Sequence, residues 1–153
     1  MLLSSKKYEE KDQPFFLKLI EESPLWQQEE GFPSELLEYR RKYEMMNGQW
    51  EVWYEGPCRI GLTFTVDWAP SNEKAWLGTI LVDGQARKRG YGKAIVHDIA
   101  RRYEKEGHDV LFTAVPLQRL EWMQFFAACE FEQLKVEEDE QKKPYMIMTR
   151  PLA

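Results

Sequence analysis

The segment Arg87-Lys88-Arg89-Gly90-Tyr91-Gly92-Lys93 has the residue types and spacing best suited to chemistry in this chain. Four of its seven side chains are cationic, although the whole chain has a formal net charge of −5. Its two glycines let a ligand approach the backbone, and a helix starting behind them offers unpaired N–H groups at the positive end of its dipole. The pattern predicts a pyrophosphate site, with a solvated basic turn as the alternative.

Two common phosphate-binding motifs are excluded for this segment. A Walker loop requires G-x-x-x-x-G-K-[S/T], which the sequence does not contain. A dinucleotide fingerprint requires a third glycine, and Ile95 stands at that position.

The N-terminal third is expected to contain two helices that help to enclose this site. The first begins at Asp12 and ends before Pro24, and the second begins at an N-cap at Ser34 and ends at Asn47-Gly48. Residues 24–33, which contain two prolines and a glycine, are expected to form a loop.

The rest of the chain is expected to alternate between strands and helices. The expected strands are 50–54, 59–68, 76–82, 109–115, 132–136 and 145–149, and the expected helices are 92–106 and 117–128. The first three strands form an antiparallel meander, and the last two form a hairpin. Strands 76–82 and 109–115 flank a helix and are therefore expected to be parallel.

Length and composition fit one domain, residues 1–153, and exclude several classes of protein. No apolar run approaches the roughly 18 residues of a membrane helix, and residues 1–12 do not resemble a signal peptide. The negative net charge argues against nucleic-acid binding. Cys58 and Cys129 form neither a disulfide framework nor a zinc pattern, so a reducing cytoplasm is expected.

Arg87-x-x-Gly90-x-Gly92 matches the [Q/R]-x-x-G-x-[G/A] motif, and on this basis the chain resembles the GCN5-related N-acetyltransferases (GNAT family). The order of the expected elements fits that family over nearly the whole chain. The resemblance implies a mixed α/β (α+β) sheet with N-terminal helices, an antiparallel meander, a βαβ unit whose two strands splay apart, and a C-terminal helix and hairpin.

The resemblance also implies where acetyl-coenzyme A would bind. Its pyrophosphate would contact the loop residues Arg87, Lys88, Arg89, Gly90, Tyr91, Gly92 and Lys93. Its pantetheine arm would pair with Ile80, Leu81 and Val82, and a main-chain N–H near Leu81 or Val82 would polarise the thioester carbonyl.

The last expected helix departs from the family pattern. Phe126 stands where members often carry a Tyr that protonates the departing thiolate, and Arg119 stands where they carry an Asn. Phe126 has no proton to give. Arg119 is a candidate ligand for a phosphate or the pantetheine arm, with a surface cation at a helix start as the alternative.

No catalytic residue follows from the sequence alone. Candidates for the base are Glu73, Asp67 and Glu51, and the alternative for each is a solvated carboxylate at a strand end. Tyr145 and Cys129 are candidates for the acid, although Cys129 also suits apolar packing. No metal site is expected, because neither histidine has a second ligand at metal spacing.

The leading hypothesis is direct transfer of an acetyl group to a primary amine, with a small molecule as the acceptor. Acidic pairs such as Glu29-Glu30 would attract a cationic amine, and Trp26, Trp53, Trp68 and Trp76 could shape an aromatic pocket. Neither cysteine is expected in the pantetheine groove, so no acetyl-enzyme is expected. The alternatives are a non-catalytic acyl-coenzyme A sensor and an acetyltransferase of protein lysines or N-termini. A homodimer is compatible with the family.

Overall fold

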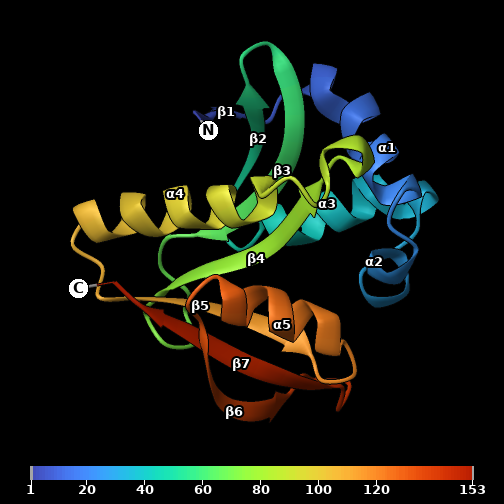
Figure 1. The fold of residues 1–153 in the computed structure, drawn as a ribbon. Helices are drawn as coiled ribbons and strands as arrows, with labels where there is room; N and C mark the ends of the chain where they lie inside the picture. The colour runs from blue at the N-terminus through green and yellow to red at the C-terminus, as the bar shows by residue number, and fades with distance from the viewer. Residues whose placement is uncertain (1, 153) are drawn as a thin grey trace.

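Seven strands form one mixed sheet in the computed structural model, which describes residues 2–152 (Figure 1). Their order across the sheet is β1-β2-β3-β4-β5-β7-β6, and β4 and β5 are the parallel neighbours. The strands are β1 (Ser4–Lys7), β2 (Gln49–Glu55), β3 (Cys58–Val66), β4 (Ala75–Val82), β5 (Val110–Pro116), β6 (Glu132–Glu138) and β7 (Pro144–Pro151). The predicted meander, parallel pair and C-terminal hairpin are therefore confirmed.

Five α-helices pack around this sheet in the described residues. They are α1 (Gln13–Glu21), α2 (Pro24–Glu29), α3 (Leu36–Glu44), α4 (Tyr91–Lys105) and α5 (Leu120–Ala128). Short 3-10 turns lie at η1 (Glu10–Asp12), η2 (Pro33–Glu35) and η3 (Gly84–Ala86). Helix α4 is the crossover that a parallel strand pair requires.

Two expectations for the N-terminal third are wrong, and one strand is an addition to those expected. Strand β1 was not expected, and it pairs antiparallel with β2. The expected loop over 24–33 contains α2, because Pro24 occupies the first helical turn, where its missing N–H costs nothing. Ser34 is not the N-cap of α3. The 3-10 turn η2 precedes α3, and the Phe32 N–H donates to the Glu35 side chain at 2.9 Å.

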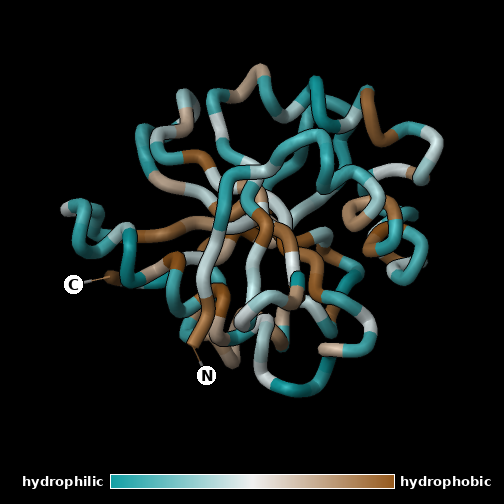
Figure 2. The backbone as a smooth tube through the Cα atoms, turned by 90° about the horizontal axis from the view of Figure 1, so that it is seen from above, coloured by the Kyte–Doolittle hydropathy of each residue, from teal (hydrophilic) through white to brown (hydrophobic). Residues whose placement is uncertain are grey.

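The hydrophobic core consists of two clusters that use different helices. One cluster joins α4 and α5 to the sheet, and the other joins α1, α2 and α3 to the sheet. Figure 2 shows hydrophobic stretches through the middle of the molecule and hydrophilic ones along the outer loops. Phe16, Leu19 and Ile20, the apolar stripe of α1, are buried.

A bulge at Gly78 changes which cluster the side chains of β4 join. Phe64 pairs with Thr79 and Thr65 pairs with Leu77, so Gly78 has no partner in β3. Leu77 consequently belongs to the cluster of α4 and α5, whereas Leu81, four residues later, belongs to the cluster of α1–α3. Regular alternation would place them on the same face.

Candidate active site

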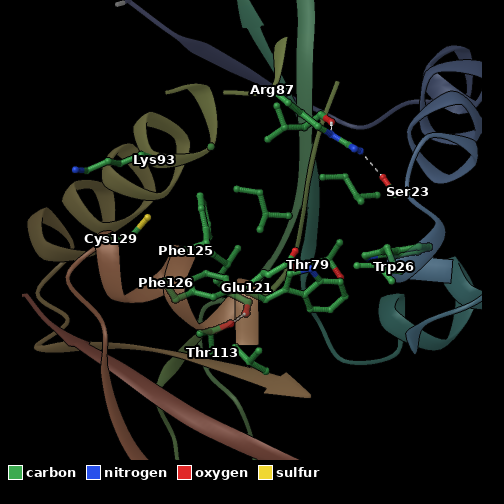
Figure 3. Close-up of a pocket in the computed structure, with 18 of the residues that line it drawn as sticks. Ser23, Trp26, Thr79, Arg87, Lys93, Thr113, Glu121, Phe125, Phe126 and Cys129 are labelled. Carbon is green, nitrogen blue, oxygen red and sulfur yellow. Dashed lines mark hydrogen bonds between the residues drawn. The ribbon is translucent and has the colours of Figure 1, made fainter. Parts of the chain in front are cut away.

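A pocket of about 770 Å³ lies where β4 and β5 separate (Figure 3). Its lining residues come from 77–82 of β4, 113–116 of β5, the loop and first turn of α4 between 86 and 93, helices α2 and α5, and Tyr145 of β7. The loop predicted from its charge and glycines therefore shares one pocket with the strand predicted to bind a pantetheine arm.

The separation of β4 from β5 begins after two residue pairs. Ala75 pairs with Leu111 and Trp76 pairs with Phe112, and no further pairing links these strands. The Thr113 hydroxyl donates a hydrogen bond to the Leu77 carbonyl at 2.8 Å, at the narrow end of the opening. Beyond it, the edge of β4 that faces β5 has no strand partner and is available to an extended ligand.

The loop after β4 is fastened to the N-terminal helices. Arg87 donates from Nε to the Val82 carbonyl at 3.2 Å and from its terminal nitrogen to Ser23 Oγ at 2.6 Å (Figure 3). The Gly84 N–H donates to Glu22 at 3.1 Å. Lys18 and Asp83 form an ion pair between the same two segments.

Both glycines of the motif have a geometric role at the start of α4. Gly90 is the N-cap and has a φ of +82°, a left-handed conformation that disfavours a side chain. A Cβ on Gly92 would lie 3.0 Å from the Phe125 ring, so a side chain here would press against that ring. The Tyr91 hydroxyl donates to Glu55 and anchors this turn to β2.

The cationic side chains of the loop divide into two groups. The guanidinium of Arg87 is occupied by Val82 and Ser23, so it positions the loop. Lys88 and Lys93 are exposed and line the pocket, whereas Arg89 is exposed outside the lining. Lys88, Lys93 and the first turn of α4 thus place positive charge at this end of the pocket, and the Lys93 ammonium extends outward, away from Trp26 and Phe126 (Figure 3).

The three carboxylates considered as the base do not line the pocket. The buried Glu51 carboxylate accepts hydrogen bonds from both terminal nitrogens of Arg102, at 2.8 and 2.9 Å, and from the Ser5 hydroxyl at 2.9 Å. Asp67 accepts the Tyr103 hydroxyl at 2.8 Å. Glu73 is exposed in the turn between β3 and β4. The structure does not support any of them as the base.

Arg119 also lies outside the pocket lining. It donates to Glu29 at 2.7 Å and to Gln28 at 2.8 Å, so it joins the start of α5 to α2. Lys143, from the turn between β6 and β7, pairs with the same Glu29 at 2.6 Å. These contacts correct the expectation of a phosphate ligand at Arg119, because its guanidinium is bound to α2 instead.

Both residues considered as the acid line the pocket, which corrects the expectation that no cysteine lies in the groove. Cys129 lies beside Lys93 and Phe125, across the pocket from Trp26 (Figure 3). Burial raises the pKa of its thiol to about 11, although Lys93 and Arg150 lower it. Burial also raises the pKa of Tyr145, against the opposing charge of Lys143.

Glu30 is the pocket residue whose importance the sequence did not show. Glu30 lines the pocket, and its carboxyl accepts a hydrogen bond from the Tyr43 hydroxyl at 3.2 Å. Burial raises the pKa of Glu30 to about 7, although the hydrogen bond from Tyr43 and the charge of Lys143 lower it. The acidic pair signalled this region, but only the fold shows which of its two carboxylates faces the pocket.

The aromatic lining differs from the expected set of tryptophans. Trp26 lines the pocket, but Trp53 is buried in the core, Trp68 is exposed and Trp76 stacks on Phe112. The lining instead includes Trp122 from α5.

Two further classes of site were searched for in residues 2–152. No group of three or more His, Cys, Asp or Glu side chains could hold a metal ion there. Within the same residues, no helix has the length and apolar character needed to cross a membrane.

Solved N-acetyltransferases share this architecture over nearly the whole chain. An acetyltransferase from Thermus thermophilus matches with a TM-score of 0.78 and 19% identity, covering 99% of this chain and 98% of that one. The ribosomal-protein-S18-alanine N-acetyltransferase of Escherichia coli matches with a TM-score of 0.70 and 13% identity, covering 99% of this chain and 95% of that one. Spermidine/spermine N-acetyltransferase SpeG of Vibrio cholerae matches with a TM-score of 0.69 and 15% identity, covering 98% of this chain and 92% of that one. The fold is that of the GNAT acetyltransferases.

Comparison of the sequence assigns the chain to a narrower family than the fold does. Residues 55–138 match the family model of FR47-like proteins. A relative from Bacillus subtilis (strain 168), the uncharacterized protein YkzC, is 40% identical over 136 residues, which cover 89% of this chain and 95% of that protein. The chain therefore belongs to the FR47-like proteins of the GNAT family, which confirms the resemblance seen in the motif.

Glu51→Gln should reduce stability without reducing activity. The amide cannot balance the charge of Arg102, so the free energy of unfolding should fall by about 1–2 kcal/mol in urea titrations. Glu132→Gln, at an exposed position in β6, is the matched control. A large loss of activity in correctly folded Glu51→Gln would restore Glu51 as a candidate base.

Glu30→Gln should stabilise the ligand-free protein at pH 8. Because the pKa of Glu30 is raised to about 7, the folded state carries an unfavourable, poorly solvated charge above that pH, which an amide removes. The gain should be on the order of 3 kcal/mol at pH 8 and should largely disappear at pH 5, where Glu30 is protonated in the folded state. Thermal unfolding at both pH values measures it. An equal effect at the two pH values would contradict the charge-based explanation.

Proposed function

We propose that this protein is an N-acetyltransferase that moves the acetyl group of acetyl-coenzyme A directly to a primary amine of a small molecule. The observation that carries this proposal is that the free edge of β4, the glycine loop before α4, helix α2 and Tyr145 all line the same pocket, with α2 and Tyr145 at the proposed acceptor end. Membership of the GNAT family supports the transferase class.

The residues of the pocket fit acetyl-coenzyme A. Lys88, Lys93 and the first-turn N–H groups of α4 suit a pyrophosphate, and a side chain at Gly90 or Gly92 would disturb that approach. The backbone edge of Ile80–Val82 suits the amide groups of a pantetheine arm, which the family resemblance assigns there. When bound, acetyl-coenzyme A supplies the thioester that acylates the amine.

Direct transfer is favoured over an acetyl-enzyme by the state of Cys129. Its thiol lines the pocket, but a pKa of about 11 keeps it protonated near neutral pH, and the thiolate is the nucleophilic form. It also lies beside Lys93, away from Trp26 at the acceptor wall (Figure 3).

The acceptor end favours a small molecule over a protein chain. Glu29 of α2 is held by Arg119 at 2.7 Å and by Lys143 at 2.6 Å, so three separate segments are joined there. Trp26 and Tyr145 supply aromatic walls. A polypeptide acceptor would require an open groove, whereas these ion pairs tie α2 to the start of α5 and to the turn between β6 and β7.

Tyr145 is the better candidate for the proton donor to the departing thiolate. It lines the pocket, and its raised pKa keeps the phenol protonated near neutral pH. Phe126, at the position of the family's Tyr, packs against Phe125 and Phe131 with ring centroids 5.1 and 5.3 Å away, so the aromatic body is retained without the hydroxyl.

That missing hydroxyl also supports a second candidate function, a non-catalytic acyl-coenzyme A sensor. Both functions require acetyl-coenzyme A to bind, and only the transferase releases coenzyme A when an amine is added. Amine-dependent thiol release therefore separates them.

Acetyl-coenzyme A should raise the thermal unfolding temperature of the wild type. At 100 times its dissociation constant, a ligand adds roughly 2.7 kcal/mol of stability, which for this size is a rise on the order of 5–10 °C. Lys88→Glu combined with Lys93→Glu should abolish the rise, because it reverses both pocket-lining cations at the end proposed for the pyrophosphate.

The matched control for that experiment is Lys7→Glu combined with Lys105→Glu. It makes the same change in charge at exposed positions outside the pocket lining, and it should keep the full rise. An unchanged unfolding temperature in the wild type at millimolar acetyl-coenzyme A would exclude the transferase and the sensor together.

Tyr145→Phe should lower kcat by about 10- to 100-fold, the lower part of the range for general acid catalysis. Cys129→Ala should leave kcat within about threefold, because direct transfer does not use the thiol. Steady-state thiol release measures both variants. A Cys129→Ala variant that binds acetyl-coenzyme A but has no activity would overturn direct transfer.

A further inference from the structure

The end of α2 presents two consecutive carboxylates in opposite electrostatic states. Glu29 is paired with Arg119 and Lys143, and despite its burial these hydrogen bonds lower its pKa. Glu30 has one hydrogen bond in the described residues, from the neutral Tyr43 hydroxyl. One carboxylate is already neutralised by the protein, and its neighbour is not.

A carboxylate that is partly withdrawn from solvent and has a single neutral partner is costly as an anion. Glu30 nonetheless lines the pocket, so a ligand can reach it. A cation that enters the pocket would supply the missing charge, in the way that Arg119 and Lys143 supply it for Glu29. The pocket therefore has an electrostatic preference for a positively charged group at this point.

We propose that Glu30 binds the ammonium group of the acceptor and takes its proton before acetyl transfer. The inference rests on the proposed function and deepens it, because it assigns the base and limits the acceptors to compact cationic primary amines.

Acetyl transfer begins with loss of a proton from the bound ammonium group. The ammonium N–H bond breaks, its proton goes to a Glu30 carboxylate oxygen, and the nitrogen lone pair attacks the thioester carbonyl. The C–N bond forms, the C–S bond breaks, and the thiolate takes up the amine's second proton, directly or through Tyr145. Glu30 then releases its proton to solvent. An ammonium and acetyl-coenzyme A thus give an acetamide, coenzyme A and one proton.

The protonation of Glu30 suits this role. Its pKa of about 7 makes it a stronger base than an ordinary carboxylate and leaves it substantially ionised at neutral pH. The charged and titratable groups around it come from four segments: Tyr43, Tyr39 and Lys42 of α3, Lys143 of the turn between β6 and β7, Tyr145 of β7, and Glu29 of α2. Among these, Tyr43 contacts Glu30 directly, so changing Tyr43 provides an independent test.

The test compares Glu30→Gln with Glu21→Gln, which makes the same change in charge at an exposed position outside the pocket. Propylamine, benzylamine and 1,4-diaminobutane serve as acceptors, and thiol release is followed from pH 5.5 to 9.5. In the wild type, kcat/KM should rise through an inflection near pH 7. Glu30→Gln should lose that inflection and about 100-fold or more in kcat at pH 8, while still binding acetyl-coenzyme A in the thermal assay. Glu21→Gln should match the wild type.

The Tyr43→Phe variant distinguishes a catalytic role of Glu30 from a purely structural one, because only a catalytic role would make the pH profile depend on this hydrogen bond. Removing the hydroxyl deprives the Glu30 carboxylate of its donor, so the pKa of Glu30 rises and the inflection in kcat/KM moves to higher pH. Glu30→Gln with the wild-type rate and pH profile would overturn the inference and leave the proposed function standing. Bound acetyl-coenzyme A without amine-dependent thiol release in the wild type would overturn the proposed function, and the inference with it.

Discussion

The early separation of β4 from β5 is the constraint on which the pocket depends. A parallel pair needs a crossover, and here the crossover is α4, which starts at the end of β4 where the two strands are already apart. The positive end of α4 is therefore placed beside an unpaired strand edge. The Thr113 hydroxyl satisfies the Leu77 carbonyl at the narrow end, so the opening begins without an unpaired group there.

Local signals were sufficient for six of the seven strands in the described residues and for the position of the loop before α4, because strand alternation and a Gly-x-Gly before a helix depend on neighbouring residues. They failed where tertiary contacts decide. β1 is a short charged segment that becomes a strand only against β2. Glu51 looked like a free strand-end acid, but its partner Arg102 lies 51 residues away in the sequence. Glu30 could not be distinguished from Glu29, because Arg119 and Lys143 reach only Glu29 through the fold.

The bulge at Gly78 shows how one residue without a cross-strand partner serves both sides of the sheet. It lets Leu77 pack toward α4 and α5, while Thr79 turns toward α3 and bonds with the Tyr39 hydroxyl at 2.9 Å. Gly78 itself is exposed in the pocket lining, midway along the free edge of β4. Sheet geometry and the shape of the pocket therefore have the same origin.

The bonds between the loop and the N-terminal helices connect the two ends of the pocket. Arg87 donates a hydrogen bond to Ser23, at the junction of α1 and α2, and the Gly84 N–H donates one to Glu22. Helix α2, the proposed wall of the acceptor end, is thus attached to the loop proposed to contact a pyrophosphate, and ordering one orders the other. We expect the two substrates to bind with positive cooperativity, because the first to bind fixes structure that the second would otherwise have to fix. Under the proposed function, acetyl-coenzyme A would contact the loop directly, and its binding would thereby order the helix beside the amine.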